Sequence, residues 1–255
     1  MSEQQENGIY IFCGIQTDVK EDFGNILLEN EERPTFTIHY KDAAMIAVKV
    51  PMKIYHPDKE NLMMHQNLIS KVMAEKDTVI PISFGNVFHS VEDVEILLEN
   101  LYPQLEELFP AIKGKMELGL KVIGKTDWLK SEVHASEKVE KLTEQLRGKT
   151  EDAGYYERIQ LGGAAQEIFS SISKEIEQEV YTPLESSAEA SKINDPVGEK
   201  MLLNASFLVD RNKETVFDQL VNEAHEKWKD KVDFKYSGPW PAYNFVNIRL
   251  TVEES

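Results

Sequence analysis

Histidine and cysteine are the residue types best able to bind metal or act as nucleophiles, and their spacing here indicates neither role. The chain has six histidines, and no two stand four residues apart as in a His-Glu-x-x-His zinc helix. Its single cysteine, Cys13, lies in the apolar run Ile9–Cys13, which predicts a small buried side chain and excludes an intramolecular disulfide. We therefore expect no catalytic, cofactor-binding or metal-binding residues, and a protein that is not an enzyme.

The glycines do not form a phosphate-binding loop. Gly162 and Gly163 follow Gly154, but the Gly-x-x-x-x-Gly-Lys-Ser/Thr spacing and the preceding strand are both missing. The Gly162–Gly163 pair is better suited to the start of a helix or to close helix packing.

An aromatic segment near the C-terminus is the strongest candidate for recognition. It reads Ser-Gly-Pro-Trp-Pro-Ala-Tyr-Asn-Phe over residues 237–245. Pro239 and Pro241 lack N–H donors, so the segment cannot lie in the middle of a sheet. Two roles stay open: a rigid connection whose Trp plugs the core, or a rigid aromatic platform for a partner. The candidate partner-binding residues are Trp240 and Tyr243, and of these we expect Trp240 to be the structural plug and Tyr243 the exposed ring.

The charge balance limits the classes of partner. The 255-residue chain has 45 acidic against 28 basic residues, a net charge of −17, and 41% apolar residues, which is enough for a packed core. Phosphate backbones and anionic membrane surfaces would repel it, so we expect neither nucleic acid nor membrane as partner. No apolar stretch of 18 residues occurs and residues 1–6 do not resemble a signal peptide, which predicts a cytoplasmic location.

The elements of the first half follow from apolar periodicity. We expect a strand at Ile9–Ile15, a hairpin of 36–40 and 43–50, a helix over 60–76 capped by Asp58, and a short strand at 78–83. A second helix begins at a Ser90/Asp93 capping box and is expected to end before Pro110. This order predicts a modified ferredoxin-like α+β sandwich over residues 1–112, with helices on one face of an antiparallel sheet.

The second half, residues 113–255, is predicted to be a further α+β domain. The expected elements, in order, are a strand at 115–122, a long antiparallel helical hairpin over 127–181, a mobile loop over 183–199, a strand at 201–209, a helix at 213–229, and strands at 232–236 and 246–252. The predicted fold class is therefore α+β with two domains.

Seven segments carry a resemblance to a known family. They are Ile9–Ile15, Lys41–Ala47, His65–Met73, Val79–Phe88, Glu117–Val122, Leu203–Val209 and Ser237–Phe245. On these segments, which span almost the whole chain, the sequence resembles the gas vesicle accessory proteins of the F/L type, nearer to the F type. It departs from the family at Ala242, where a proline is frequent.

The resemblance implies assembly and not catalysis. Proteins of this family are minor components or assembly factors of gas vesicles, which are hollow protein shells. Their presumed partner is the small, very hydrophobic main shell protein, together with other gas vesicle accessory proteins. They are thought to limit its aggregation and to help nucleate the shell. The expected contact is an exposed sheet edge or the rim near Trp240 and Tyr243, in a cytoplasmic protein associated with gas vesicles.

Two other functions stay open from the sequence. One is an enzyme or small-ligand-binding protein on ferredoxin-like domains, which a polar pocket with convergent titratable groups would favour. The other is a general adaptor that binds several partners through the helical hairpin at 127–181.

Overall fold

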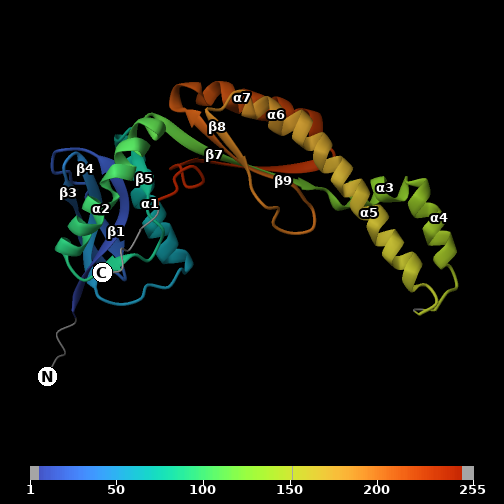
Figure 1. The fold of residues 1–255 in the computed structure, drawn as a ribbon, viewed down its shortest axis with the longest axis horizontal. Coiled ribbons are helices and arrows are strands. Elements are labelled where there is room, and N and C mark those ends of the chain that lie inside the picture. The colour runs from blue at the N-terminus through green and yellow to red at the C-terminus, as the bar shows by residue number, and fades with distance from the viewer. Residues whose placement is uncertain (1–5, 151, 249–255) are drawn as a thin grey trace. The chain divides into compact units, whose positions relative to one another are not determined.

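The computed structural model describes residues 6–150 and 152–248, which form two compact units (Figure 1). The first unit contains the described residues up to Glu117 and those from Pro239 onward, and the second contains Leu118–Gly238. This division differs from the expected boundary near residue 112, because the C-terminal segment groups with the first unit. Among the described residues, no helix is long and apolar enough to cross a membrane.

The first unit is built on an antiparallel sheet with the strand order β2-β3-β4-β1-β5, and β6 also pairs with β1. The strands are β1 (Asn7–Gln16), β2 (Asn25–Leu28), β3 (Glu31–Tyr40), β4 (Ala43–Pro51), β5 (Val79–Pro81) and β6 (Val87–Phe88). The predicted hairpin at Lys41–Asp42 is confirmed, since Tyr40 pairs with Ala43 across that turn.

Two capped helices cover this sheet. Helix α1 (Lys59–Glu75) begins at Asp58, whose side chain accepts a hydrogen bond from the Asn61 backbone, and α2 (Val91–Ile112) begins at the predicted Ser90/Asp93 capping box. The prediction that α2 ends before Pro110 is wrong. The helix continues for three more residues, to Ile112, because its last turn buries Phe109 and Ile112 in the core.

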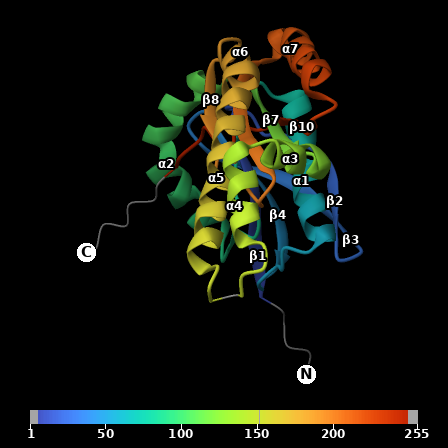
Figure 2. The ribbon, with the colours of Figure 1, turned by 90° about the vertical axis from the view of Figure 1, so that its right-hand side faces the viewer.

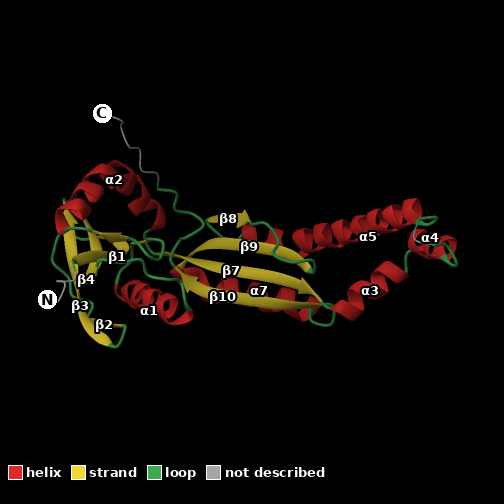
Figure 3. Ribbon diagram, turned by 90° about the horizontal axis from the view of Figure 1, so that it is seen from below, coloured by secondary structure: helices red, strands yellow, loops and turns green. Residues whose placement is uncertain are grey.

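Helices α1 and α2 lie on opposite faces of the sheet, and not on one face as expected (Figure 3). The ring of Tyr10 in β1 contacts His65 of α1, whereas the adjacent Ile11 lines a cavity together with Leu97 and Leu101 of α2. Successive strand residues point to opposite faces, so these contacts place one helix on each side. Both faces of the central strands β1 and β4 are buried as a result.

The second unit has a four-stranded sheet of order β10-β7-β9-β8. Its strands are β7 (Lys115–Gly124), β8 (Ala190–Ile193), β9 (Met201–Asp210) and β10 (Val232–Trp240). Helix α7 (Glu214–Trp228) packs on it through Phe217, whose ring lies 5.2 Å from that of Phe207. Strand β10 includes Pro239 and is an edge strand, where a missing N–H donor is tolerated.

A helical region interrupts this sheet between β7 and β8. It comprises α3 (Thr126–His134), α4 (Glu137–Leu146), α5 (Tyr155–Ile176), a π turn η1 (Glu177–Tyr181) and α6 (Thr182–Glu185). Figures 1 and 2 both show α4 beside α5, and the two pack through Val139, Leu142 and Ala164. The first arm expected at 127–181 is thus two helices, α3 and α4, and not one.

The structure corrects one further expectation and covers only part of another. The segment 183–199, expected as a mobile loop, contains the end of α6 and strand β8, which pairs with β9 from Ala190↔Leu208 to Ile193↔Ala205. Of the strand expected at 246–252, residues 246–248 are not in a strand and the remainder lies outside the described residues.

Candidate partner-binding surface

A buried carboxylate anchors the aromatic segment in the first unit. Glu117, on β7, is 4% exposed, and its carboxylate accepts hydrogen bonds from the backbone N–H of Asn244 at 2.8 Å and from the Asn244 amide at 2.5 Å. Within the segment, the N–H of Tyr243 donates to the carbonyl of Pro241 and that of Val246 donates to the carbonyl of Ala242. These bonds fold the chain after β10 into a compact turn.

The two predicted site residues differ in how far they are exposed. Trp240 is half-buried, and Tyr243 is 39% exposed. The hydroxyl of Tyr243 is nevertheless desolvated, and this burial, with smaller contributions from Cys13 and Glu117, raises the pKa of Tyr243 to about 12. The phenol is therefore neutral at physiological pH, and the ring presents a partly accessible, uncharged surface. A role of either residue in partner binding remains a proposal.

His65 and Cys13 are buried structural residues. The hydroxyl of Tyr10 donates to His65 Nδ1 at 3.0 Å, His65 Nε2 donates to the Ile82 carbonyl at 3.1 Å, and the Gly85 N–H donates to the Tyr10 oxygen at 3.0 Å. Burial lowers the pKa of His65 and raises that of Cys13, so both are neutral. Because these polar atoms are all satisfied internally, the His65 cluster has no free group for chemistry.

Metal binding finds no support in the described part of the chain. Across residues 6–150 and 152–248, no group of three or more His, Cys, Asp or Glu side chains is placed to hold a metal ion.

The first unit has an apolar groove that the sequence analysis did not identify. We name it the β2–α1 groove, with a volume of about 580 Å³. Its apolar lining residues are Phe23, Ile26, Leu27, Met63, Met64 and Leu68. Leu27 is 58% exposed and Met63 52%, so both side chains are accessible in the groove.

The groove depends on a hairpin that the sequence analysis missed. No strand was expected between Ile15 and Phe36, but β2 and β3 pair across a two-residue turn at Glu29 and Asn30. Both turn residues have positive φ, 53° and 65°, as a type I′ turn requires. Such a turn normally has Asn or Gly at both positions, and because Glu29 occupies the first, the residue types do not indicate a turn.

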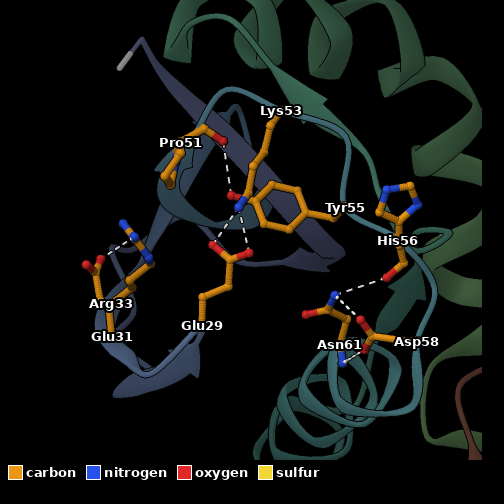
Figure 4. Close-up of polar contacts among 9 residues, drawn as sticks. All are labelled: Glu29, Glu31, Arg33, Pro51, Lys53, Tyr55, His56, Asp58 and Asn61. Atoms are coloured by element: carbon orange, nitrogen blue, oxygen red, sulfur yellow. Dashed lines mark hydrogen bonds and ion pairs between the residues drawn. The ribbon is translucent and has the colours of Figure 1, made fainter. Parts of the chain in front are cut away.

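Polar contacts fix the end of this hairpin (Figure 4). Lys53, which follows β4, donates to both carboxylate oxygens of Glu29 at 2.6 and 2.7 Å. Tyr55 donates to the Pro51 carbonyl at 3.0 Å and so shapes the same connection. The Glu29–Lys53 pair is partly exposed, so it stabilises the fold by less than about 1 kcal/mol and serves mainly to position the turn.

Comparisons with known proteins agree with this fold. The family profile described as gas vesicle synthesis protein GvpL/GvpF matches residues 8–247. Gas vesicle protein F1 of Halobacterium salinarum is 26% identical over 221 residues, covering 86% of this chain and 84% of the relative. Gas vesicle protein F of Nostoc sp. is 27% identical over 198 residues, covering 76% of this chain and 80% of the relative.

Two crystal structures share the fold, which confirms the predicted α+β class. GvpF from Anabaena sp. matches with a TM-score of 0.82 at 21% identity, covering 96% of this chain and all of that one. GvpF from Microcystis aeruginosa matches with a TM-score of 0.75 at 19% identity, covering 93% and 98%. Because the family profile spans nearly the full length, the resemblance noted in the seven segments is also confirmed, and the chain belongs to the gas vesicle synthesis protein GvpL/GvpF family.

Proposed function

We propose that this chain is a gas vesicle assembly factor, or minor structural component, that binds the hydrophobic main shell protein. In this role it limits aggregation of the shell protein and supports nucleation of the vesicle. The observation that carries the proposal is the family match over residues 8–247, in a family described by gas vesicle synthesis. The role is non-enzymatic and needs no cofactor. It is exercised in the cytoplasm, at the growing vesicle, alongside other gas vesicle accessory proteins.

The charge of the chain supports this role. A very hydrophobic subunit in water exposes apolar surface and strand edges, which promote aggregation. A binding protein with a net charge of −17 keeps a complex of the two in solution, because the complexes repel one another. The same charge disfavours nucleic acid and anionic membranes as competing partners.

The described surface offers apolar side chains for such binding. Leu27 and Met63 border the β2–α1 groove, and Tyr243 borders a second cavity, of about 330 Å³, with Leu97 and Leu101 of α2. We include Trp240 and Tyr243 in the proposed contact surface, because the Glu117 anchor holds their segment in one conformation and reduces the entropy lost on binding.

Co-expression with the main shell protein from the same genome tests the proposal. We expect a tagged form of this chain to co-purify the shell protein and to raise the fraction of shell protein that stays in the supernatant after centrifugation. A tagged, unrelated protein of similar size and net charge serves as control. The proposed function would be refuted if the shell protein did not co-purify and if equal amounts of it sedimented with this chain and with the control.

A further inference from the structure

We propose that the β2–α1 groove binds an extended apolar segment of the main shell protein as an additional strand along β2. This inference rests on the proposed function and names the surface and the mode of binding. It depends on three features of the first unit: a strand at the end of its sheet, an apolar wall opposite that strand, and the charges around them.

The first feature is the free edge of β2. In the strand order β2-β3-β4-β1-β5, strand β2 is last, and Figure 3 shows it at the end of the sheet near α1. The N–H of Thr35 donates to the Gly24 carbonyl at 3.0 Å, which makes these residues a hydrogen-bonded pair. Hydrogen-bonded and non-hydrogen-bonded pairs alternate along an antiparallel ladder, so the N–H and C=O groups of Asn25 and Leu27 point away from β3. A further strand would find its hydrogen-bonding partners there.

The second feature is the wall that α1 places opposite this edge. A strand added to β2 would direct every second side chain toward Met63, Met64 and Leu68. A groove between an edge strand and a helix is a known geometry for binding extended peptides, in which main-chain bonds give affinity and alternate side chains give specificity. The volume of about 580 Å³ lies within the range of ligand-binding pockets. The flexible methionine side chains would adapt to differently shaped apolar residues.

The third feature is charge, which selects the occupant. The groove is lined by two lysines, Lys59 and Lys71, and one glutamate, Glu60, in a chain whose net charge is −17. The groove is therefore a non-acidic region of an acidic surface, and it suits an apolar segment without basic residues. The proposed occupant is accordingly an apolar segment of the shell subunit that carries no basic residue.

The same charges disfavour a second copy of this chain as occupant. Pairing β2 with β2 of another copy would bring together two strongly acidic chains and two copies of the acidic segment that contains Glu29, Glu31 and Glu32. Charged residues beside an edge strand are a common protection against such self-pairing.

A pair of matched proline variants tests the hydrogen bonds. Leu27→Pro removes an outward-facing N–H from β2 without removing a β2–β3 bond. Ile193→Pro does the same at β8, the edge of the other sheet, because the N–H of Asn194 donates to the Asn204 carbonyl and Ile193 consequently points outward. Leu27 is 58% exposed and Ile193 46%. In the co-purification assay with the main shell protein, we expect Leu27→Pro to lower recovery at least tenfold and Ile193→Pro less than twofold.

A second pair tests the apolar wall. Met63→Glu places a charge in the groove, whereas Ile159→Glu places one at an equally exposed position of helix α5. We expect loss of shell protein only for Met63→Glu. Hydrogen exchange gives a direct readout, since the Asn25 and Leu27 amides should exchange at least tenfold more slowly in the complex with the shell protein.

The outcomes separate this inference from the proposed function. If the wild-type chain binds the shell protein and the Leu27 and Met63 variants bind equally well, the groove is not the site but the function stands. If the wild-type chain does not bind, the function fails, and with it the partner named here. If light scattering shows a dimer of the free chain that Leu27→Pro dissociates, the occupant is a second copy and the inference is wrong.

Discussion

Replacing the buried anchor Glu117 with glutamine should loosen the aromatic segment while leaving the rest of the fold intact. In the wild-type chain one carboxylate accepts both the backbone N–H and the side-chain amide of Asn244. Glutamine keeps the shape but loses the charge: its single oxygen accepts one of the two donors, and the Asn244 amide must turn its own oxygen toward the glutamine N–H to keep a second, neutral bond.

The expected magnitude follows from the charge of the lost acceptor. A hydrogen bond to a charged group stabilises a fold by about 1.5–3 kcal/mol. With about 2 kcal/mol lost, local opening of the segment becomes about 30-fold more frequent. Because amide exchange reports local opening, the amides of Tyr243, Asn244 and Val246 should exchange about 30-fold faster in Glu117→Gln.

Hydrogen–deuterium exchange at constant pH measures this effect amide by amide. The matched control is Glu99→Gln, in which the exposed side chain keeps an amide oxygen that can still accept from the Tyr40 hydroxyl. We expect less than a threefold change anywhere in that variant. If the Glu117→Gln variant is folded and its exchange rates at Asn244 and Val246 change less than threefold, Glu117 does not anchor the segment.

Three further variants test other parts of the structure. Burial holds the pKa of His65 below 6.5, so the histidine is protonated in the unfolded chain before it is protonated in the folded one as pH falls. The unfolding free energy is therefore at its full value above about pH 6.5 and declines below that pH by up to about 1.4 kcal/mol per pH unit. Urea midpoints from pH 7.5 to 5.5 should fall less in His65→Gln than in the wild type, and equal slopes would contradict the account. Phe217→Ala should lower the unfolding free energy by about 3–5 kcal/mol, measured by urea denaturation against Ile54→Ala, whose exposed side chain should leave it unchanged. Asn30→Val should cost about 1–2 kcal/mol in the same measurement, since its φ of 65° is left-handed, and an unchanged midpoint would exclude strain there.

The sequence predicted the elements that have strong local signals. The cap at Asp58, the Ser90/Asp93 box and the hairpin at Lys41–Asp42 depend on a few adjacent residues, and all are confirmed. The sequence also contains a signal that β1 is buried on both faces, but we interpreted it as a sheet with helices on one face. Its seven consecutive residues Ile9–Ile15 contain no charged or strongly polar side chain, as is typical of a strand covered on both sides.

The elements that escaped prediction depend on partners far away in the chain. Strand β8 reads Ala-Ser-Lys-Ile, without an apolar pattern, and forms because β9 offers it an edge. Trp240 and Tyr243 could be proposed from composition, but their anchor, Glu117, lies 127 residues from Asn244 and nothing local connects the two. The β2–α1 groove was missed because it requires β2, whose turn carries Glu29 in a conformation typical of Asn or Gly.

The π turn η1 keeps the second half of the long helix in phase with the first. The buried side chains Ile172, Ile176, Val180 and Leu184 recur every four residues. In a regular α-helix of 3.6 residues per turn, each step of four advances about 40° too far, so three steps would rotate Leu184 by about 120° from the line of Ile172. The wider turn at Glu177–Tyr181 absorbs this excess rotation. Insertion or deletion of one residue there would turn the α6 side chains away from the interior, so the length of this stretch is constrained even where its residue types are free to vary.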